Sequence, residues 1–120
     1  MSLNDTSFSL EVLPATIANG ASLTDTINLF GLRLFGIVMP SSWTAASLTF
    51  QVSPDGGATW TNMYDQSGSE VAAVADVLRC IILNPLQFTS VQYIRVRSGT
   101  SSSAVTQAAS RSLKLILRPV

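Results

Sequence analysis

The stretch Leu48–Val52, Leu-Thr-Phe-Gln-Val, decides the fold of this chain, because its apolar residues alternate with polar ones. Successive side chains of a β-strand point to opposite faces of a sheet, so a period of two predicts a strand that buries one face. Similar alternation returns at Phe8–Val12, Ile94–Val96 and Leu113–Leu117. The pattern predicts antiparallel strands with one side in a core and one side in water.

Turn-forming residues divide the chain at short intervals. They cluster at Asn19-Gly20, Met39-Pro40, Ser53–Gly57, Ser67-Gly68 and Asn84-Pro85. This spacing is typical of an all-β sandwich or barrel. Leu32–Met39 and Leu78–Leu83 are more continuously apolar, which predicts central strands covered on both faces. We therefore expect an all-β, antiparallel β-sandwich of about eight strands.

The length of 120 residues suits one domain with a single core. We expect a flexible N-terminal arm over residues 1–7 and one β-sandwich domain over residues 8–120. The small polar residues of Ser98–Ser112 predict a loop that is mobile or is ordered by a partner. The N-terminal arm is a second candidate for a segment that becomes ordered on a partner.

Two segments carry helix signals. Ser67-x-x-Glu70 matches a helix capping box, and the valines after it fall near helical spacing, although β-branched residues and a short length favour strand and turn. Residues 69–78 therefore remain open between strand and helix. Asn84-Pro85 places an N-cap residue before a proline, which predicts a single helical turn.

The charge balance limits the partners. Seven basic and seven acidic residues cancel, and charged residues make up only 12% of the chain. We expect neither nucleic acid nor an anionic membrane as a partner, because no basic field is available to hold them. A nearly neutral surface tends to associate, so a homo-oligomer or coverage by other subunits is expected. The first six residues lack the features of a secretory signal, which predicts synthesis in the cytoplasm.

Enzymatic groups are scarce. Histidine is absent, which removes the usual general base and the commonest metal ligand. The single cysteine, Cys80, lies in an apolar run and is expected to be buried and inert. The mid-chain carboxylates are Asp55, Asp65, Glu70 and Asp76. They form neither a recognisable acid/base pair nor a calcium loop, so we expect no catalysis, no metal and no cofactor.

Residues 53–60, Ser-Pro-Asp-Gly-Gly-Ala-Thr-Trp, predict a structured hairpin turn. Ser53 begins the motif, Asp55 is expected to accept hydrogen bonds, and Gly57 to adopt a positive φ. Thr59 is expected to close the turn and Trp60 to pack back on the hairpin. The octapeptide resembles the Asp-box of sialidases, which is a structural turn in that family and implies no active site here.

A longer resemblance covers residues 46–117. The chain presents, in order, a strand, the Asp-Gly hairpin, an apolar strand, Asn84–Phe88, Tyr93–Arg97 and a final Leu-rich strand. This series resembles discoidin-type domains with the galactose-binding-like fold. The resemblance implies a jelly-roll-like sandwich, although the chain lacks the terminal cysteine pair of that family.

Met39–Phe50, Tyr93–Thr100 and Gln107–Arg111 carry a second resemblance. Together with the hairpin they are similar to small proteins encoded beside the head genes of tailed bacteriophages and prophages. The resemblance implies a non-enzymatic virion structural protein, namely a head decoration, cement or spike component. Its partners would be capsid or other virion proteins, bound through many repeated contacts.

Five side chains are candidates for an interface or a ligand. Tyr93, Arg95 and Arg97 share one face of a strand, which either is a solvated outer face or binds acidic groups of a neighbour. Trp43 either plugs an end of the sandwich or is an exposed platform, and Tyr64 stands beside an acid at a strand end. A carbohydrate-binding module of jelly-roll type that uses Trp43, Tyr64 and an arginine is the alternative function.

Overall fold

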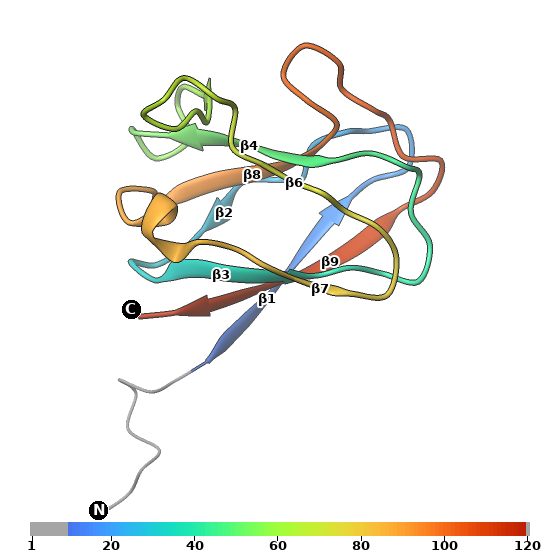
Figure 1. The fold of residues 1–120 in the computed structure, drawn as a ribbon, viewed down its shortest axis with the longest axis horizontal. Helices are drawn as coiled ribbons and strands as arrows, with labels where there is room; N and C mark the ends of the chain where they lie inside the picture. Colours follow the sequence, from blue (N-terminus) through green and yellow to red (C-terminus); the bar gives the residue numbers. More distant parts are fainter. Residues whose placement is uncertain (1–9, 120) are drawn as a thin grey trace, which may run out of the picture.

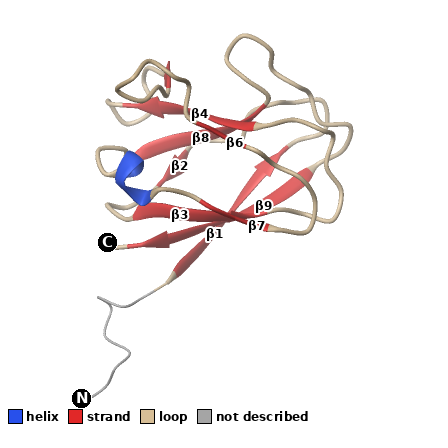
Figure 2. Cartoon of the chain, viewed as in Figure 1, coloured by secondary structure: helices blue, strands red, loops and turns tan. Residues whose placement is uncertain are grey.

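The computed structural model of the chain describes residues 10–119, which form two antiparallel sheets packed face to face (Figures 1 and 2). Sheet A contains, in spatial order, β1 (Glu11–Ile17), β9 (Arg111–Arg118), β3 (Arg33–Val38) and β7 (Cys80–Ile82). Sheet B contains β2 (Ile27–Asn28), β8 (Tyr93–Ser98), β4 (Leu48–Ser53) and β5 (Thr61–Asn62), with β6 (Ala72–Ala73) also paired to β4. The predicted arm, residues 1–7, lies outside the described residues.

The strand order is that of a jelly roll. The first strand pairs with the last, and each sheet combines strands from both halves of the sequence. Because β5 and β6 pair with different halves of the same edge of β4, they act as one interrupted strand. Two four-stranded layers then result, as in jelly-roll domains. The predicted all-β antiparallel sandwich is confirmed, with nine strands instead of about eight.

The core lies between the sheets and includes the alternating residues of three of the predicted strands. The alternation at Phe8–Val12 was misassigned, because Leu10 and Val12 are exposed and β1 buries Ala15 and Ile17 instead, while Phe8 lies outside the described residues. The fully buried apolar strand positions are Ile17 of β1, Leu34 and Ile37 of β3, Leu48 and Phe50 of β4, Ile94 and Val96 of β8, and Leu113, Leu115 and Leu117 of β9. Phe88 packs its ring edge-to-face on Phe50, with the ring centroids 5.3 Å apart. Burial of each such side chain contributes about 1.5–3 kcal/mol, so these alternating positions dominate the stability of the sandwich.

The prediction for Leu78–Leu83 is wrong. Within the described residues β7 pairs only with β3 and forms an edge of sheet A. Ile81 turns toward the core, whereas Ile82 is 79% exposed and Leu78 is also exposed. Cys80, expected to be buried, is exposed as well. The apolar composition of this run reflects an exposed outer face and not a strand covered on both sides.

Residues 69–78 contain no helix, so the strand-and-turn interpretation is confirmed, with β6 as the strand. Strand pairing to β4 takes precedence over the helical spacing of the valines. The helical turn predicted at Asn84-Pro85 is present as a 3-10 helix, Pro85–Phe88. The side chain of Asn84 accepts a hydrogen bond from the backbone N–H of Leu86 at 3.1 Å and caps this turn.

The loop between β8 and β9 is anchored by Gln107, which is 1% exposed. Its Nε2 donates to the Thr44 carbonyl at 3.0 Å and to Ser98 Oγ at 2.7 Å. Its Oε1 accepts from the Thr44 N–H at 2.9 Å and from Arg111 Nε at 3.0 Å. The chain's own contacts therefore hold this loop, and a partner is not needed to order it.

Candidate functional site

The hairpin that connects β4 to β5 is closed by side-chain hydrogen bonds. Asp55 accepts from the Thr59 hydroxyl at 2.6 Å, the Thr59 N–H at 2.9 Å and the Ser53 hydroxyl at 2.8 Å. Ser53 Oγ in turn accepts from the Gly57 N–H at 2.7 Å, and Gly57 has φ +99°, which favours glycine. The Thr59 hydroxyl, followed by the Thr59 N–H and the Ser53 hydroxyl, lowers the pKa of Asp55 to about 2. The Asp55 carboxylate is therefore occupied by hydrogen bonds that stabilise the turn.

Trp60 ends this hairpin and packs on Arg95 of β8. The guanidinium carbon of Arg95 lies 4.2 Å from the centroid of a Trp60 ring, a cation–π contact. A Cβ placed on Gly57 would lie 3.8 Å from the same indole, so the tryptophan ring stands against the turn. Tyr93 and Arg95 are both half-buried. Arg95 thus contributes to the hairpin and is only partly available to a neighbour.

Arg97 does not belong to an exposed face, contrary to its prediction as an interface residue. It is 5% exposed and donates from Nε to Thr49 Oγ1, from one terminal nitrogen to Asn62 Oδ1 and from the other to Glu70 Oε2, each at 2.9 Å. The Glu70 carboxylate also accepts from the Ser101 N–H at 3.1 Å. The segment 63–71 between β5 and β6 folds over this part of sheet B and brings the acid to the arginine. The alternating pattern of a strand does not indicate which distant segment of the chain will cover its outer face.

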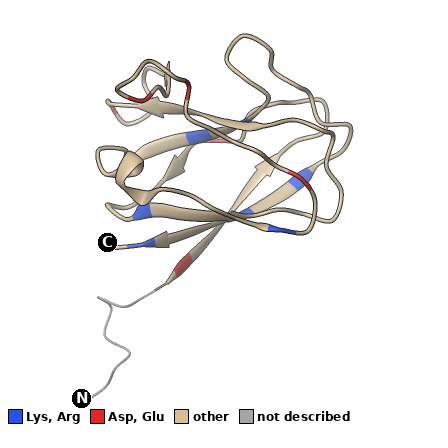
Figure 3. Ribbon diagram, in the orientation of Figure 1, with Lys and Arg blue, Asp and Glu red and all other residues tan. Residues whose placement is uncertain are grey.

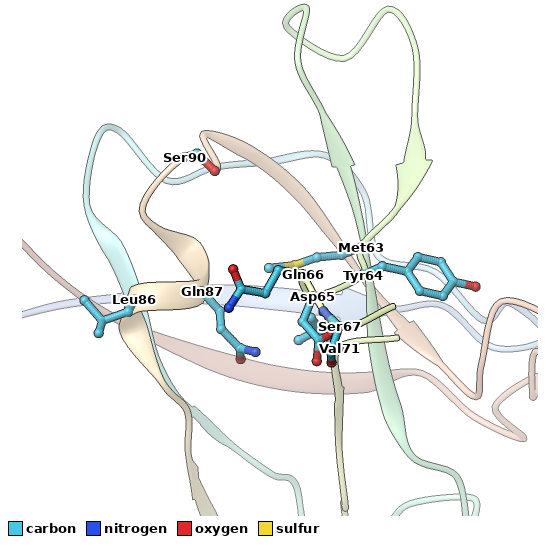
Figure 4. Close-up of a pocket in the computed structure, with 9 residues that line it drawn as sticks. All are labelled: Met63, Tyr64, Asp65, Gln66, Ser67, Val71, Leu86, Gln87 and Ser90. Atoms are coloured by element: carbon cyan, nitrogen blue, oxygen red, sulfur yellow. Dashed lines mark hydrogen bonds between the residues drawn. The ribbon is translucent and has the colours of Figure 1, made fainter. Parts of the chain in front are cut away.

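A groove of about 740 Å³ lies between segment 63–71 and the 3-10 helix (Figure 4). Met63 and Val71 are the buried members of its lining. The polar residues that line it are Tyr64, Asp65, Gln66, Ser67, Gln87 and Ser90. The Tyr64 ring points away from the carboxamides of Gln66 and Gln87, and its hydroxyl lies 3.3 Å from Ser101 Oγ. Trp43 is not part of this lining.

Asp65 supplies the groove with a fixed negative charge. It accepts hydrogen bonds from the Ser67 hydroxyl at 2.7 Å, the Ser67 N–H at 2.9 Å and the Ser69 N–H at 3.0 Å. The hydrogen bond from the Ser67 side chain, followed by that from the Ser69 backbone, lowers the pKa of Asp65. Ser67 therefore belongs to an aspartate-centred turn and not to the helix capping box that its spacing resembles.

Trp43 packs partly against the core, and its indole Nε1 donates to the Ala46 carbonyl at 3.1 Å. The next residue, Thr44, is tied to the buried Gln107. The structure therefore gives Trp43 a local packing role. Of the five candidate side chains, only Tyr64 lines the groove.

The outer face of sheet A has one row that is apolar across all four strands, beside a row that contains Lys114. Its two central rows are, in register, Val12, Ile116, Gly36 and Ile82, then Pro14, Lys114, Val38 and Cys80. Val12 is 48% exposed, and Ile82 is more exposed still, so this apolar surface meets solvent. Sequence reasoning missed this face. Ile116 is the available signal, because it occupies the position between Leu115 and Leu117 where an alternating strand would carry a polar side chain.

Cations flank this apolar face. Lys114 lies in the second row, and Arg118 and Arg33 are neighbours at one end of β9 and β3 (Figure 3). Glu11, the only acid in the strands of sheet A, lies in phase with the inward-facing Leu13. The strands of sheet A therefore contribute three cations and no carboxylate to this outer face.

These features define the class of protein: a jelly-roll β-sandwich whose hairpin and Arg97 clusters are satisfied by hydrogen bonds within the chain and whose sheet A presents an apolar row on its outer face. Comparisons with family models, with curated proteins and with solved structures find no match. Between residues 10 and 119 no helix is long and apolar enough to cross a membrane. In the same part of the chain, acids and cysteine do not gather in groups of three that would hold a metal ion.

Proposed function

We propose that this chain is a non-enzymatic structural protein of a tailed-phage or prophage virion, a head decoration, cement or spike component. It attaches to the particle through the outer face of sheet A. The single observation that carries the proposal is the apolar outer row of this sheet, in which Val12 and Ile82 on the two edge strands are exposed and Ile116 between them is half-buried. Soluble monomers rarely expose a large contiguous apolar surface, and such surfaces mark interaction sites.

The charges on this face define the partner surface. Lys114 lies within the second row, Arg33 and Arg118 lie at one end of β3 and β9, and the strands of sheet A place no carboxylate beside them. Two copies of the chain packed through this face would set cations against cations, which disfavours self-association there. The complementary partner is an apolar surface that carries carboxylates, on a protein of the particle shell. Repetition of the contact over many copies provides the attachment.

Cys80 permits a direct test, because it is the only cysteine of the chain and lies on the proposed contact face. Particles from an induced lysate are purified by density gradient, and the chain is quantified in the particle band by mass spectrometry. The band is then treated with iodoacetamide before denaturation. We expect a fixed, high copy number and much slower alkylation of Cys80 than in the free chain.

The matched control is a variant with Cys80→Ser and Ser102→Cys, since Ser102 is exposed on the loop between β8 and β9. Its thiol should react at the same rate in the free and bound chain. Lys114→Glu should lower the copy number on the particle because it reverses a charge on the contact face. Absence of the chain from the particle band, or equal alkylation of Cys80 in the free and bound chain, would overturn the proposal.

A carbohydrate-binding module is the second candidate function, supported by the polar groove between segment 63–71 and the 3-10 helix. Carboxamides of Gln66 and Gln87 beside the charged Asp65 offer donors and acceptors for sugar hydroxyls. Calorimetric titration with host glycans tests this function. Heat of binding that disappears in Gln87→Ala, but persists in a variant of Trp43, would support the groove. Absence of binding by any glycan would exclude it.

A further inference from the structure

The turn between β2 and β3 presents an exposed phenylalanine in an unfavourable backbone conformation. Phe30 has φ +55° and is 69% exposed, and the following Gly31 has φ +78°. The Leu32 N–H donates to the Leu29 carbonyl at 2.9 Å and closes a two-residue turn. Asparagine and glycine normally occupy such positions, because other side chains are strained at positive φ. Neither the strain nor the exposure of Phe30 stabilises the isolated chain, which points to a function for its ring.

Phe30 borders an apolar notch of about 280 Å³. Leu13, Leu32 and Leu117 line the notch together with Phe30, and Glu11 is the charged member of its lining. The β2–β3 turn, the start of β1 and the end of β9 lie at the same end of the sandwich (Figure 1). An apolar cavity of about 150 Å³ is enough to take up benzene, so the notch has room for one aromatic ring.

The charges around the notch are of both signs. Glu11 lines the notch in phase with the inward-facing Leu13, whereas Arg33 and Arg118, which directly follow the lining residues Leu32 and Leu117, lie on the outer side of the same end of sheet A. The ion pairs among the described residues are those of Arg79 and Arg97, so none of these three groups is already paired there. An apolar centre with an acid on one side and bases on the other is complementary to a rotated copy of itself. The outer face of sheet A lacks this property because its strands supply only cations.

We propose that this end of the sandwich joins two copies of the chain about a two-fold axis. Phe30 of each copy occupies the notch of the other, and Glu11 pairs with Arg118 of the partner subunit. The proposed contact goes beyond the proposed function and does not require it. It leaves the central rows of the outer face of sheet A free, so that a dimer still attaches to a particle through that face.

Sedimentation equilibrium of the purified chain over a range of concentrations measures the dimer directly. Phe30→Asn removes the ring, and asparagine tolerates positive φ, so the turn is retained. We expect the dimer Kd of this variant to rise at least about tenfold, as for loss of an aromatic anchor at an interface. Its midpoint of thermal unfolding, measured at a concentration where both proteins are monomeric, should be equal to or above that of the unaltered chain.

Charge reversal tests the two-fold pairing. Glu11→Arg alone and Arg118→Glu alone should each weaken the dimer, because each brings two like-charged pairs together. An equimolar mixture of the two variants restores both opposite-charge pairs and should recover a heterodimer. Lys114→Glu is the matched control, since Lys114 lies outside the notch and its reversal should leave the dimer Kd unchanged.

Three results would overturn the proposal. The first is an unaltered chain that stays monomeric up to about 1 mM, the weakest range of specific association. The second is an unchanged Kd for Phe30→Asn. The third is a mixture of the two charge variants that associates no better than either alone. Particle attachment is measured separately through Cys80 and Lys114, so failure of the dimer and failure of the proposed function are distinguishable.

Discussion

The outer faces of the two sheets differ in polarity and in whether the chain itself covers them. Sheet B places polar and charged groups outward, and the chain itself covers them: segment 63–71 lies over Arg97, and Trp60 packs on Arg95. Sheet A places Val12, Ile116 and Ile82 outward and leaves them in contact with solvent. A buried guanidinium needs every donor satisfied, so its cover must come from the same chain. An apolar face instead remains available for a partner.

Replacement of Arg97 should produce the largest loss of stability, because the segment that covers the outer face of sheet B is hydrogen-bonded to this residue. Arg97→Ala leaves the largely buried Glu70 carboxylate without its cation and leaves Thr49 and Asn62 without their donor. We expect the free energy of unfolding to fall by about 3 kcal/mol, the lower end for a broken buried ion pair. Urea denaturation followed by tryptophan fluorescence measures it.

Arg95→Ala is the matched control, two residues away on the same strand face. It removes a half-buried cation–π contact, which is worth about 0.5–1 kcal/mol. Equal losses in the two variants would contradict the distinction between a covered and an exposed part of this face.

The acid dependence of stability should show a smaller effect at the hairpin. The folded-state pKa of Asp55 is about 2, below its ordinary value of 3.8. A lowered carboxyl pKa contributes stability that is present above pH 3.8 and is lost as pH falls through about 2. Asp55→Asn should therefore be less stable than the unaltered chain near pH 6, and the difference should shrink between pH 4 and pH 2.

Thr59→Val gives the control for the hairpin, because the Thr59 hydroxyl is the first cause of the lowered pKa. The free energy of unfolding of this variant should depend less on pH over the same interval. A gap between Asp55→Asn and the unaltered chain that stays constant down to pH 2 would show that the Asp55 carboxylate is not held in its charged form.

The sequence predicted what depends on local pattern. Alternation at Leu48–Val52 and Leu113–Leu117 placed the core strands, and Asn84-Pro85 placed the short helix, because neighbouring residues determine each of these features. The sequence did not predict the ion pair of Arg97 with Glu70, since 27 positions separate these residues and only the tertiary fold joins them. The apolar run at Leu78–Leu83 was misjudged for a related reason. Periodicity reports that residues are apolar, whereas the sheet order decides whether anything covers them.

The smallest expected effect on stability is also the sharpest test of the contrast between the two faces. Ile82 and Ile81 are adjacent in β7 and chemically identical, but Ile81 turns toward the core while Ile82 faces solvent. Ile82→Ser should change the free energy of unfolding by less than about 0.5 kcal/mol, as is usual for an exposed position. Ile81→Ser should lower it by about 2 kcal/mol, because a largely packed isoleucine is lost.

The variants Ile82→Ser and Ile81→Ser also distinguish an effect on folding from an effect on attachment to the particle. Ile82→Ser should reduce the copy number on purified particles despite an unchanged fold, since the removed side chain belongs to the proposed contact face. Circular dichroism and denaturation check the fold, and mass spectrometry of the particle band measures occupancy. Unchanged occupancy for Ile82→Ser, together with normal stability, would remove β7 from the contact face. Lower stability and lower occupancy together would instead assign Ile82 to the fold, because an exposed isoleucine that stabilises the free chain must be packed against it.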